Sequence, residues 1–308
     1  MAKILIAGLN PAWQQILVTP SLRIGGVNRA VESHALAGGK GINVAKILAR
    51  RGHEVSLLHV LAGTNGDRLL DGCTALGILS LHVFSEGETR AAVTVIHDDT
   101  ATEIIEPFKV SDADIGDIEQ SLLEAVSDET EYDALLICGT LPGGLNPGFY
   151  GELIQRISCK KIIWDSVVPF SEETAQRITW IKVNAEEHRA LAPVFENYGV
   201  NPGLLITDGP GKASVQGPQG SQGSQGSGSA AEGAGTYALP NLQNVVSPIG
   251  AGDTVTAMLT DGLLAGLPVA EAVTRALACG MASCLSPLPA EWKTSDANTL
   301  EKEILWER

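Results

Sequence analysis

The stretch Ile249-Gly250-Ala251-Gly252-Asp253-Thr254 leads directly into a pattern that predicts a helix, because apolar residues recur at helical spacing from Val255 to Leu263. The two glycines form a turn at the helix start, where unpaired N–H groups and the helix dipole favour an anion. Gly250 and Gly252 have no side chains, so an anion can approach the main chain closely. Asp253 either caps this helix or serves as a general base beside an anion-binding turn.

The composition indicates an ordinary globular protein of one large domain, or one large and one small domain. The 308 residues are 44% hydrophobic and 19% charged, and the net charge of −15 argues against nucleic-acid or anionic-membrane partners. The five cysteines include no C-x-x-C pair, which predicts reduced thiols in the cytoplasm. We find no signal-peptide pattern and no apolar run of the roughly 18 residues that a membrane span needs.

Short apolar runs alternate with helical patterns along most of the chain, which predicts an α/β fold with a parallel sheet covered on both faces. Ligands of such sheets bind at the carboxyl ends of the strands, so the residues just past each run are candidates for a site. The expected strands are Lys3–Ala7, Val55–Val60, Asp133–Cys138, Lys161–Asp165, Trp180–Val183 and Leu204–Thr207. The expected helices are Gly39–Arg51, Ala113–Val126, Pro147–Ile157, Glu186–Leu191 and Val269–Cys284.

Two regions depart from this alternation. Short β-branched runs predict a small antiparallel sheet drawn from about 12–34 and 88–108, which acts as a lid or dimer surface, or else as an extra layer on the body. Its expected strands are Gln14–Val18, Val27–Ser33, Ala91–His97 and Thr102–Pro107. Residues 217–235 are rich in Gly, Ser and Gln and predict a flexible loop between strands Ala213–Gln216 and Thr236–Leu239.

A second glycine turn, Gly38-Gly39-Lys40-Gly41, opens the predicted helix Gly39–Arg51 and has Asn43 one turn further on. It is not a phosphate-binding G-x-x-x-x-G-K-[ST] loop, which the chain lacks. A G-x-G-x-x-G motif is also missing after the first strand, which weakens a dinucleotide-binding interpretation. Alone, this turn is equally consistent with a structural role.

Together, the two turns resemble the two signatures of the ribokinase-like (PfkB) carbohydrate kinases. The first is Ala37-Gly38-Gly39-Lys40-Gly41-Ile42-Asn43-Val44-Ala45 and the second is Val246-Ser247-Pro248-Ile249-Gly250-Ala251-Gly252-Asp253-Thr254. The resemblance is closest to the 1-phosphofructokinase and tagatose-6-phosphate kinase branch. It includes Asn10-Pro11, Val27-Asn28-Arg29, Gly87-Glu88-Thr89-Arg90 and Thr102-Glu103-Ile104. It implies a three-layer α/β/α fold with a single kinase domain over 1–308.

The resemblance also implies roles in the transfer of a phosphoryl group from ATP. Asp253 would be the catalytic base, with an anion hole formed by Gly250, Ala251, Gly252 and the Asp253 N–H. Asn184 and Glu187 match an N-x-x-E motif that organises hydrated Mg²⁺. Residues implied to border the nucleotide are Lys182, Asn184, Thr207, Gly209 and Gly211.

The implied substrate is a sugar phosphate. Arg29 and Arg90 match cations that hold its existing phosphate, since guanidinium groups suit phosphate geometry. The sugar-binding positions are Gln14, Gly38, Gly39, Lys40, Asn43 and Thr140. Two of these depart from the branch, because Gln14 stands where the branch has an aspartate that grips sugar hydroxyls and Thr140 replaces a serine.

Each assignment has a structural alternative. Arg29 and Arg90 could instead be solvated charges on strands, and Lys182 could be a surface lysine at the end of a strand. Asn184 and Glu187 could form a capping box at the start of a helix. The resulting hypothesis is an ATP- and Mg²⁺-dependent kinase of fructose 1-phosphate, with tagatose 6-phosphate next, that forms a homodimer through the lid. The alternatives are a family kinase for a free sugar or nucleoside, and a non-catalytic sensor of nucleotide or sugar phosphate.

Overall fold

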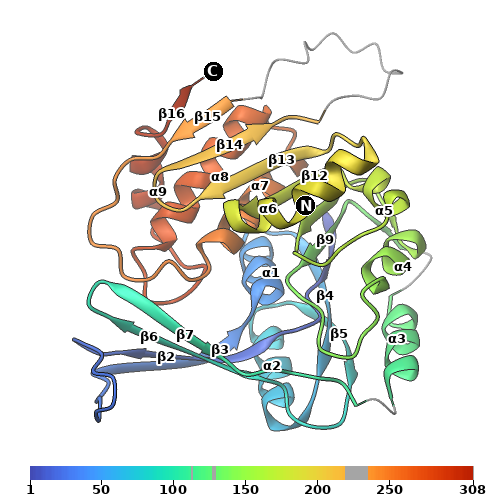
Figure 1. Cartoon of the computed structure of the whole chain (residues 1–308), viewed down its shortest axis with the longest axis horizontal. Helices are drawn as coiled ribbons and strands as arrows, with labels where there is room; N and C mark the ends of the chain where they lie inside the picture. Colours follow the sequence, from blue (N-terminus) through green and yellow to red (C-terminus); the bar gives the residue numbers. More distant parts are fainter. Residues whose placement is uncertain (112–113, 127–129, 219–234, 308) are drawn as a thin grey trace.

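A large, mostly parallel sheet forms the centre of the protein (Figure 1). The computed structural model describes residues 1–111, 114–126, 130–218 and 235–307. Ten strands follow the order β16-β15-β14-β13-β12-β11-β9-β1-β4-β5 within these residues, and only the pairs from β13 to β16 are antiparallel. The strands are β1 (Lys3–Ala7), β4 (Glu54–Leu61), β5 (Leu79–Phe84), β9 (Ala134–Cys138), β11 (Ile162–Asp165), β12 (Trp180–Asn184), β13 (Gly203–Asp208), β14 (Lys212–Gln216), β15 (Gly235–Ala238) and β16 (Leu305–Glu307).

Helices cover both faces of this sheet, because the buried strands are apolar on both sides. Along β1, Ile4 and Ile6 face one core while Leu5 and Ala7 face the other. One layer consists of α1 (Lys40–Arg50), α2 (Gly63–Ala75), α7 (Ala251–Leu264), α8 (Val269–Ser283) and α9 (Thr294–Glu301). The opposite layer consists of α3 (Ile115–Glu124), α4 (Phe149–Arg156), α5 (Glu172–Arg177) and α6 (Ala185–Tyr198). The predicted three-layer fold is confirmed.

The lid is a separate four-stranded sheet that projects from the body (Figure 1). Its strands, in the order β3-β2-β6-β7, are β2 (Ala12–Val18), β3 (Glu32–Gly38), β6 (Ala91–His97) and β7 (Thr100–Ile105). Two antiparallel hairpins form it, but the β2–β6 pair at its centre is parallel. A pair of two-residue strands, β8 (Glu131–Tyr132) and β10 (Ser158–Cys159), lies apart from both larger sheets.

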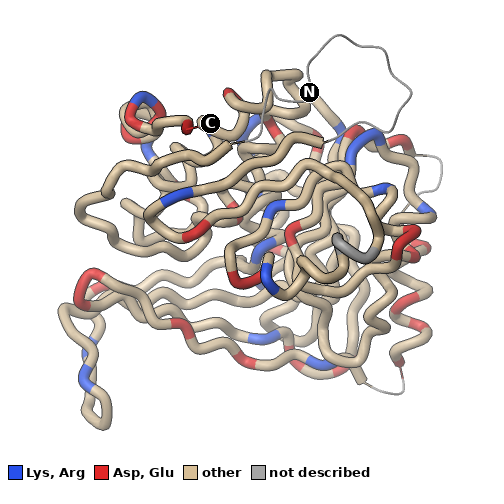
Figure 2. The backbone as a smooth tube through the Cα atoms, turned by 45° about the horizontal axis from the view of Figure 1, so that its top comes forward, with Lys and Arg blue, Asp and Glu red and all other residues tan. Residues whose placement is uncertain are grey.

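The predicted strand Val27–Ser33 is wrong, since the second lid strand begins at Glu32. The side chain of Asn28 instead closes a turn by hydrogen bonds to both the N–H and the C=O of Arg23. Residues 19–31 therefore form a loop that extends beyond the rest of the molecule (Figures 1 and 2). Residues 219–234 of the predicted flexible loop lie outside the described residues.

Helix α2 and strand β5, which lie between the two predicted lid segments, were not predicted from the sequence. Helix α2 contains Gly63, Gly66 and Gly72, which weaken its helical signal. A Cβ at position 72 would lie 2.7 Å from Ala37 Cβ, so tertiary packing of this helix against the lid favours glycine there. No helix in the described ranges is both long and apolar enough to span a membrane.

Candidate functional site

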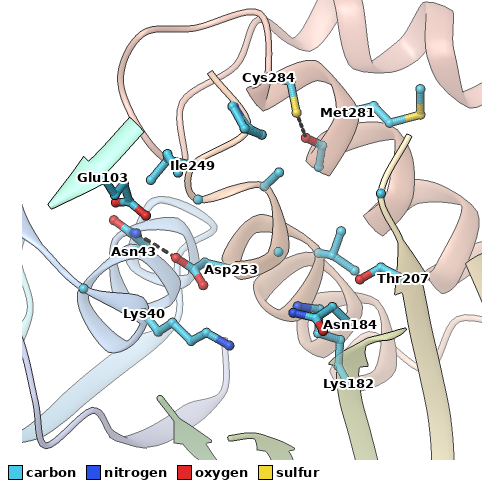
Figure 3. A pocket seen from close by; sticks show the side chains of 18 of the residues that line it. Lys40, Asn43, Glu103, Lys182, Asn184, Thr207, Ile249, Asp253, Met281 and Cys284 are labelled. Carbon is cyan, nitrogen blue, oxygen red and sulfur yellow. Dashed lines mark hydrogen bonds between the residues drawn. The ribbon is translucent and has the colours of Figure 1, made fainter. Parts of the chain in front are cut away.

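The glycine turn before α7 opens onto a cavity of about 730 Å³ (Figure 3). Gly250 is the N-cap of α7 in the left-handed conformation, with φ of 82°. A Cβ there would lie 2.7 Å from Pro289 Cβ and 2.8 Å from Ala290 N, so a neighbouring loop supports this turn closely. The Gly252 position faces the Lys182 ammonium, which would lie 2.8 Å from a Cβ at 252. The start of α7 thus faces a cavity with a cation beside it.

The cavity collects most of the predicted site residues from distant parts of the chain. Side chains of α1 and β7, including Lys40, Asn43 and Glu103, lie at one end, and those of β12 and β13 at the other (Figure 3). The predicted residues that line it are Gln14, Gly39, Lys40, Asn43, Arg90, Lys182, Asn184, Glu187, Thr207, Gly209, Gly250, Ala251, Gly252 and Asp253.

Asp253 is a nearly buried carboxylate in the first turn of α7, with 7% of its surface exposed. Its Oδ2 accepts a hydrogen bond of 2.7 Å from Asn43 Nδ2, which ties α7 to α1 (Figure 3). Burial raises the pKa of Asp253, and the nearby Lys40 charge opposes that rise. A carboxyl whose pKa lies above its usual range is better matched to proton abstraction than an exposed one.

Near Asp253 lies a cluster of four charged residues and one hydroxyl group, which we call the charged cluster. Its members are Lys40, Asp165, Lys182, Glu187 and Thr256. Lys40 Nζ lies 2.7 Å from Asp165 Oδ1 and 3.2 Å from Glu187 Oε1. Asp165 Oδ2 accepts a hydrogen bond of 2.6 Å from Thr256 and lies 3.8 Å from Lys182 Nζ. Burial alone would raise the pKa of Asp165, but Lys182 and Lys40 hold it below its usual range. Lys40 and Lys182 therefore flank one buried, ionised carboxylate at the cavity floor.

Asn184 and Glu187 form a capping box at the start of α6. Asn184 Oδ1 accepts hydrogen bonds from the N–H groups of Glu186 and Glu187, and Glu187 Oε2 accepts one of 2.8 Å from Asn184 N–H. The structural alternative from the sequence is therefore realised. Both side chains nevertheless reach the cavity, so capping and a role beside bound phosphates are compatible.

A further part of the cavity, which we call its apolar end, is lined by apolar side chains and suits a flat, weakly polar ring. Its walls come from the segment between β15 and α7 and from one face of α8. The side chains there are Leu239, Leu242, Val245, Leu277, Met281 and Cys284. These residues were not predicted, because apolar side chains on one face of a helix give the same sequence pattern as core packing.

Four predicted site residues do not line the cavity. Arg29 lies in the exposed loop 19–31, and Thr140 Oγ1 accepts a hydrogen bond of 3.1 Å from Asn10 Nδ2. Gly38 lies under Gln14, because a Cβ there would be 2.6 Å from Gln14 Oε1. Gly211 follows the lining residue Gly209 by two positions, and no described atom lies within 4 Å of a Cβ added at Gly211.

Three further polar residues of the site were not predicted. Asp165 ends strand β11 and Thr256 is buried in α7, while Glu103 faces the cavity from β7. The rule that ligands bind at the carboxyl ends of parallel strands could have found Asp165. Glu103 stands in a stretch quoted for the family resemblance, but no role was assigned to it from that resemblance.

Comparisons with known proteins agree over nearly the whole chain. The pattern that defines the pfkB family carbohydrate kinases matches residues 13–294. A tagatose-6-phosphate kinase of Staphylococcus epidermidis is 26% identical, over 98% of each chain. A 1-phosphofructokinase of Rhodobacter capsulatus is 28% identical, over 90% of this chain and 88% of the relative.

The same fold is found in solved structures at lower identity. Phosphofructokinase-2 from Escherichia coli superposes with a TM-score of 0.77 at 20% identity, over 98% of this chain and 99% of its own. Ribokinase from Thermotoga maritima gives a TM-score of 0.67 at 17% identity, over 98% of this chain and 100% of its own. The family match, which spans most of the sequence, confirms the predicted resemblance, and the protein belongs to the pfkB family of carbohydrate kinases, phosphotransferases with an alcohol group as acceptor.

Proposed function

We propose that this protein transfers the γ-phosphoryl group of ATP to a hydroxyl of a phosphorylated hexose. Fructose 1-phosphate is the first candidate and tagatose 6-phosphate the second. Relatives with the corresponding kinase names match almost the full chain, which supports this substrate class. Arg90 lines the cavity and supplies a guanidinium for the phosphate that the sugar already carries.

In the proposed reaction, Asp253 takes the proton from the attacking hydroxyl. The hydroxyl oxygen then bonds to the γ-phosphorus while the bond to the bridging oxygen breaks, and ADP leaves with that electron pair. Negative charge on the transferring group is offset by Lys40, Lys182 and the start of α7. Ala251 N–H donates to Pro248 O at 3.2 Å, so the N–H groups of Gly252 and Asp253 carry most of the anion hole.

Asn184 and Glu187 line the cavity and would hold a largely hydrated Mg²⁺ ion through its water molecules. No group of three ligating His, Cys, Asp or Glu side chains occurs in the described chain that would hold an ion by itself. Asn184 Oδ1 and both Glu187 oxygens already accept hydrogen bonds, so they fit contact through water better than direct ligation. When bound, Mg²⁺ neutralises charge on the β- and γ-phosphates.

The remaining parts of the cavity fit the two substrates. The apolar end suits the adenine ring of ATP, and Thr207 and Gly209 also line the cavity. The lid residues Gln14 and Glu103 face the end where the sugar would lie. Closure of the lid over the sugar would exclude water and so limit hydrolysis of ATP.

One observation carries the proposal: Asp253, the N-terminus of α7 and the ammonium groups of Lys40 and Lys182 face one cavity. The test is an ATP-coupled screen of hexose phosphates, free sugars and nucleosides with purified protein. Turnover of a hexose phosphate above all other acceptors is the expected result. Preference for a free sugar or nucleoside would favour the first alternative, and ATP binding without any transfer would favour a sensor.

We further propose a homodimer through the lid. Exposed apolar side chains gather on the 19–31 loop and the outer strand, where Ile24 is 88%, Val27 71%, Val31 72% and Ile104 65% exposed. Such a grouping is typical of an interaction surface. Light scattering should show a dimer that Ile104→Lys weakens, while Leu79→Lys on the exposed edge strand β5 leaves it intact. A monomeric wild-type protein would contradict the proposal.

A further inference from the structure

We propose that the Glu103 carboxylate accepts hydrogen bonds from hydroxyl groups of the sugar and thereby selects the substrate, held in place by Thr94 and Gln14. The inference rests on the proposed function and assigns the hydroxyl-binding acceptor within that site. Glu103 lies on β7 at the lid end of the cavity, on the same side as Asn43 and Asp253 (Figure 3).

Only three carboxylates line this cavity in the described chain, and two of them have other partners. Asp253 is the proposed base and accepts a hydrogen bond from Asn43. Glu187 is engaged through Oε1 by Lys40 and through Oε2 by Asn184 N–H. Glu103 accepts one hydrogen bond, of 3.3 Å, through Oε1 from Thr94 Oγ1. Its Oε2 accepts none from any residue that the structure describes, which leaves a charged acceptor facing the sugar end.

The position of Glu103 is fixed by a chain of hydrogen bonds across the lid. Gln14 Nε2 donates to Thr94 Oγ1 at 3.2 Å, and that hydroxyl donates onward to Glu103. Thr94 and Glu103 are directly paired across the antiparallel β6–β7 hairpin. Gln14 is 3% and Thr94 1% exposed, so both are held by packing, whereas Glu103 is exposed to the cavity. These hydrogen bonds orient the Glu103 carboxylate through Oε1 and leave Oε2 available to a ligand.

The glutamine at position 14 accounts for this arrangement. An amide offers both a donor and an acceptor, so Gln14 can orient the Thr94 hydroxyl toward Glu103. A carboxylate at 14 could only accept, which would turn the Thr94 hydroxyl hydrogen away from Glu103 and place two negative charges near each other. Gly38 leaves the space that Gln14 Oε1 occupies. With Gln14 neutral, Glu103 is the single acidic residue among the described strand residues of the lid that line the cavity.

Arg90 and Glu103 carry opposite charges and both line the cavity, which suits a sugar phosphate. Arg90 donates to the carbonyl groups of Asn10 at 2.7 Å and Pro11 at 3.2 Å, which anchors its guanidinium at the cavity wall. Burial lowers the pKa of Arg90 and raises the pKa of Glu103, and the attraction between their opposite charges counters both shifts. A ligand with an anionic phosphate at one end and hydroxyl donors along its length satisfies both groups.

The test compares Glu103→Ala, Glu103→Gln, Thr94→Val and a matched control, Asp99→Asn, in steady-state assays. Asp99 carries one negative charge in the turn between β6 and β7, and its left-handed φ of 57° suits asparagine. The acceptor is the hexose phosphate that the wild-type protein turns over, together with its 3-deoxy and 4-deoxy analogues. Thermal unfolding of each variant confirms that it is folded.

We expect Glu103→Ala to raise the KM for the sugar phosphate by roughly 10- to 100-fold, as expected for loss of a hydrogen bond to a charged group. The KM for ATP should not change, and Glu103→Gln should give a smaller increase because a neutral acceptor remains. Thr94→Val should raise the KM partly and add nothing in the Glu103→Ala background, which a merely structural role would not produce. The control should match the wild type.

The deoxy analogues provide the decisive comparison. The effect of Glu103→Ala should disappear with the analogue that lacks the contacted hydroxyl. An unchanged KM in Glu103→Ala, or an equal increase with both analogues, would overturn the inference while leaving the kinase function intact. A wild-type protein that turns over no hexose phosphate would refute the proposed function itself, and the inference with it.

Discussion

Lys40 Nζ lies 2.7 Å from Oδ1 of Asp165, and this pair joins the first helix to the end of a central strand below the cavity. Asp165 is fully buried, whereas the Lys40 side chain is 32% exposed and reaches the cavity. The buried carboxylate therefore positions an ammonium group whose other side faces the proposed phosphates. Through its second oxygen, it also offsets part of the charge of Lys182.

We expect Asp165→Asn to destabilise the protein by about 3 kcal/mol, since removal of one partner leaves buried charge without compensation. Lys182 is 3% exposed and would have no carboxylate within 4 Å among its described contacts. Urea unfolding of the variant and the wild type would measure the difference. The control is Glu271→Gln, which removes an exposed i,i+4 partner of Arg275 and should change stability by less than about 0.5 kcal/mol. Equal stability of the two variants would contradict the prediction.

Asp253→Asn should reduce turnover by roughly 10²- to 10⁴-fold if Asp253 is the general base. The asparagine keeps the shape of the side chain, so the KM for ATP should change little. In the wild type, activity should fall on the acid side as Asp253 becomes protonated, with an apparent pKa above the usual aspartate range. Steady-state rates of both proteins between about pH 4 and about pH 8 would measure both effects. Unchanged turnover in the folded variant would reject the assignment.

The same substitution should increase stability near neutral pH. A carboxyl whose pKa is higher in the folded than in the unfolded state destabilises the fold when ionised, and that penalty disappears as the pH falls through the folded-state pKa. The amide that replaces the carboxyl carries no charge in either state, so the stability gain should be present at neutral pH and shrink in acid. Denaturant unfolding at several pH values would test this. A stability loss that is the same at every pH would contradict it.

The layers of the fold and the location of the site were predictable because they depend on local patterns. Apolar runs that end in glycine or a polar residue identified β1, β4, β9, β11, β12 and β13, and the glycine turn identified the start of α7. Asn43 and Asp253 were both selected from sequence, although they are 210 positions apart, because each follows its own glycine turn.

The remaining features depend on contacts that no local pattern records. Helix α2 could not be predicted because glycines at 63, 66 and 72 lower its helix propensity. The helix forms nevertheless, since it packs against the lid. The second lid strand was placed too early because Val27 and Val31 are β-branched, whereas Asn28 turns the chain there. The hydrogen bonds that join Gln14, Thr94 and Glu103 depend on strand pairing, which periodicity does not specify.

Glu187→Gln should raise the Mg²⁺ concentration needed for half-maximal activity and lower turnover. An amide oxygen can still accept from Asn184 N–H, so the capping box at α6 is largely kept. The lost charge removes one of the anions near Lys40 and the proposed magnesium water shell. The control is Glu186→Gln on the same helical turn, since Glu186 does not line the cavity. Parallel Mg²⁺ titrations that coincide for both variants and the wild type would contradict the proposed role.

Gly250→Ala should lower both the stability and the turnover of the protein. Gly266→Ala is the control, because it introduces the backbone strain of a positive φ without a steric clash. Both glycines have positive φ, of 82° and 73°, and flank α7 at its two ends. No described atom lies within 4 Å of a Cβ added at Gly266, so its substitution costs about 1 kcal/mol of backbone strain alone.

At Gly250 the added methyl would also meet Pro289 Cβ at 2.7 Å and Ala290 N at 2.8 Å. The turn must then move, so we expect a total loss of at least about 2 kcal/mol. Because the moved N–H groups are those proposed to hold the phosphoryl group, turnover should fall roughly 100-fold or more, as for loss of an oxyanion-hole donor. Gly266→Ala should keep its turnover. Equal turnover of the two variants would show that the position of this turn does not control phosphoryl transfer.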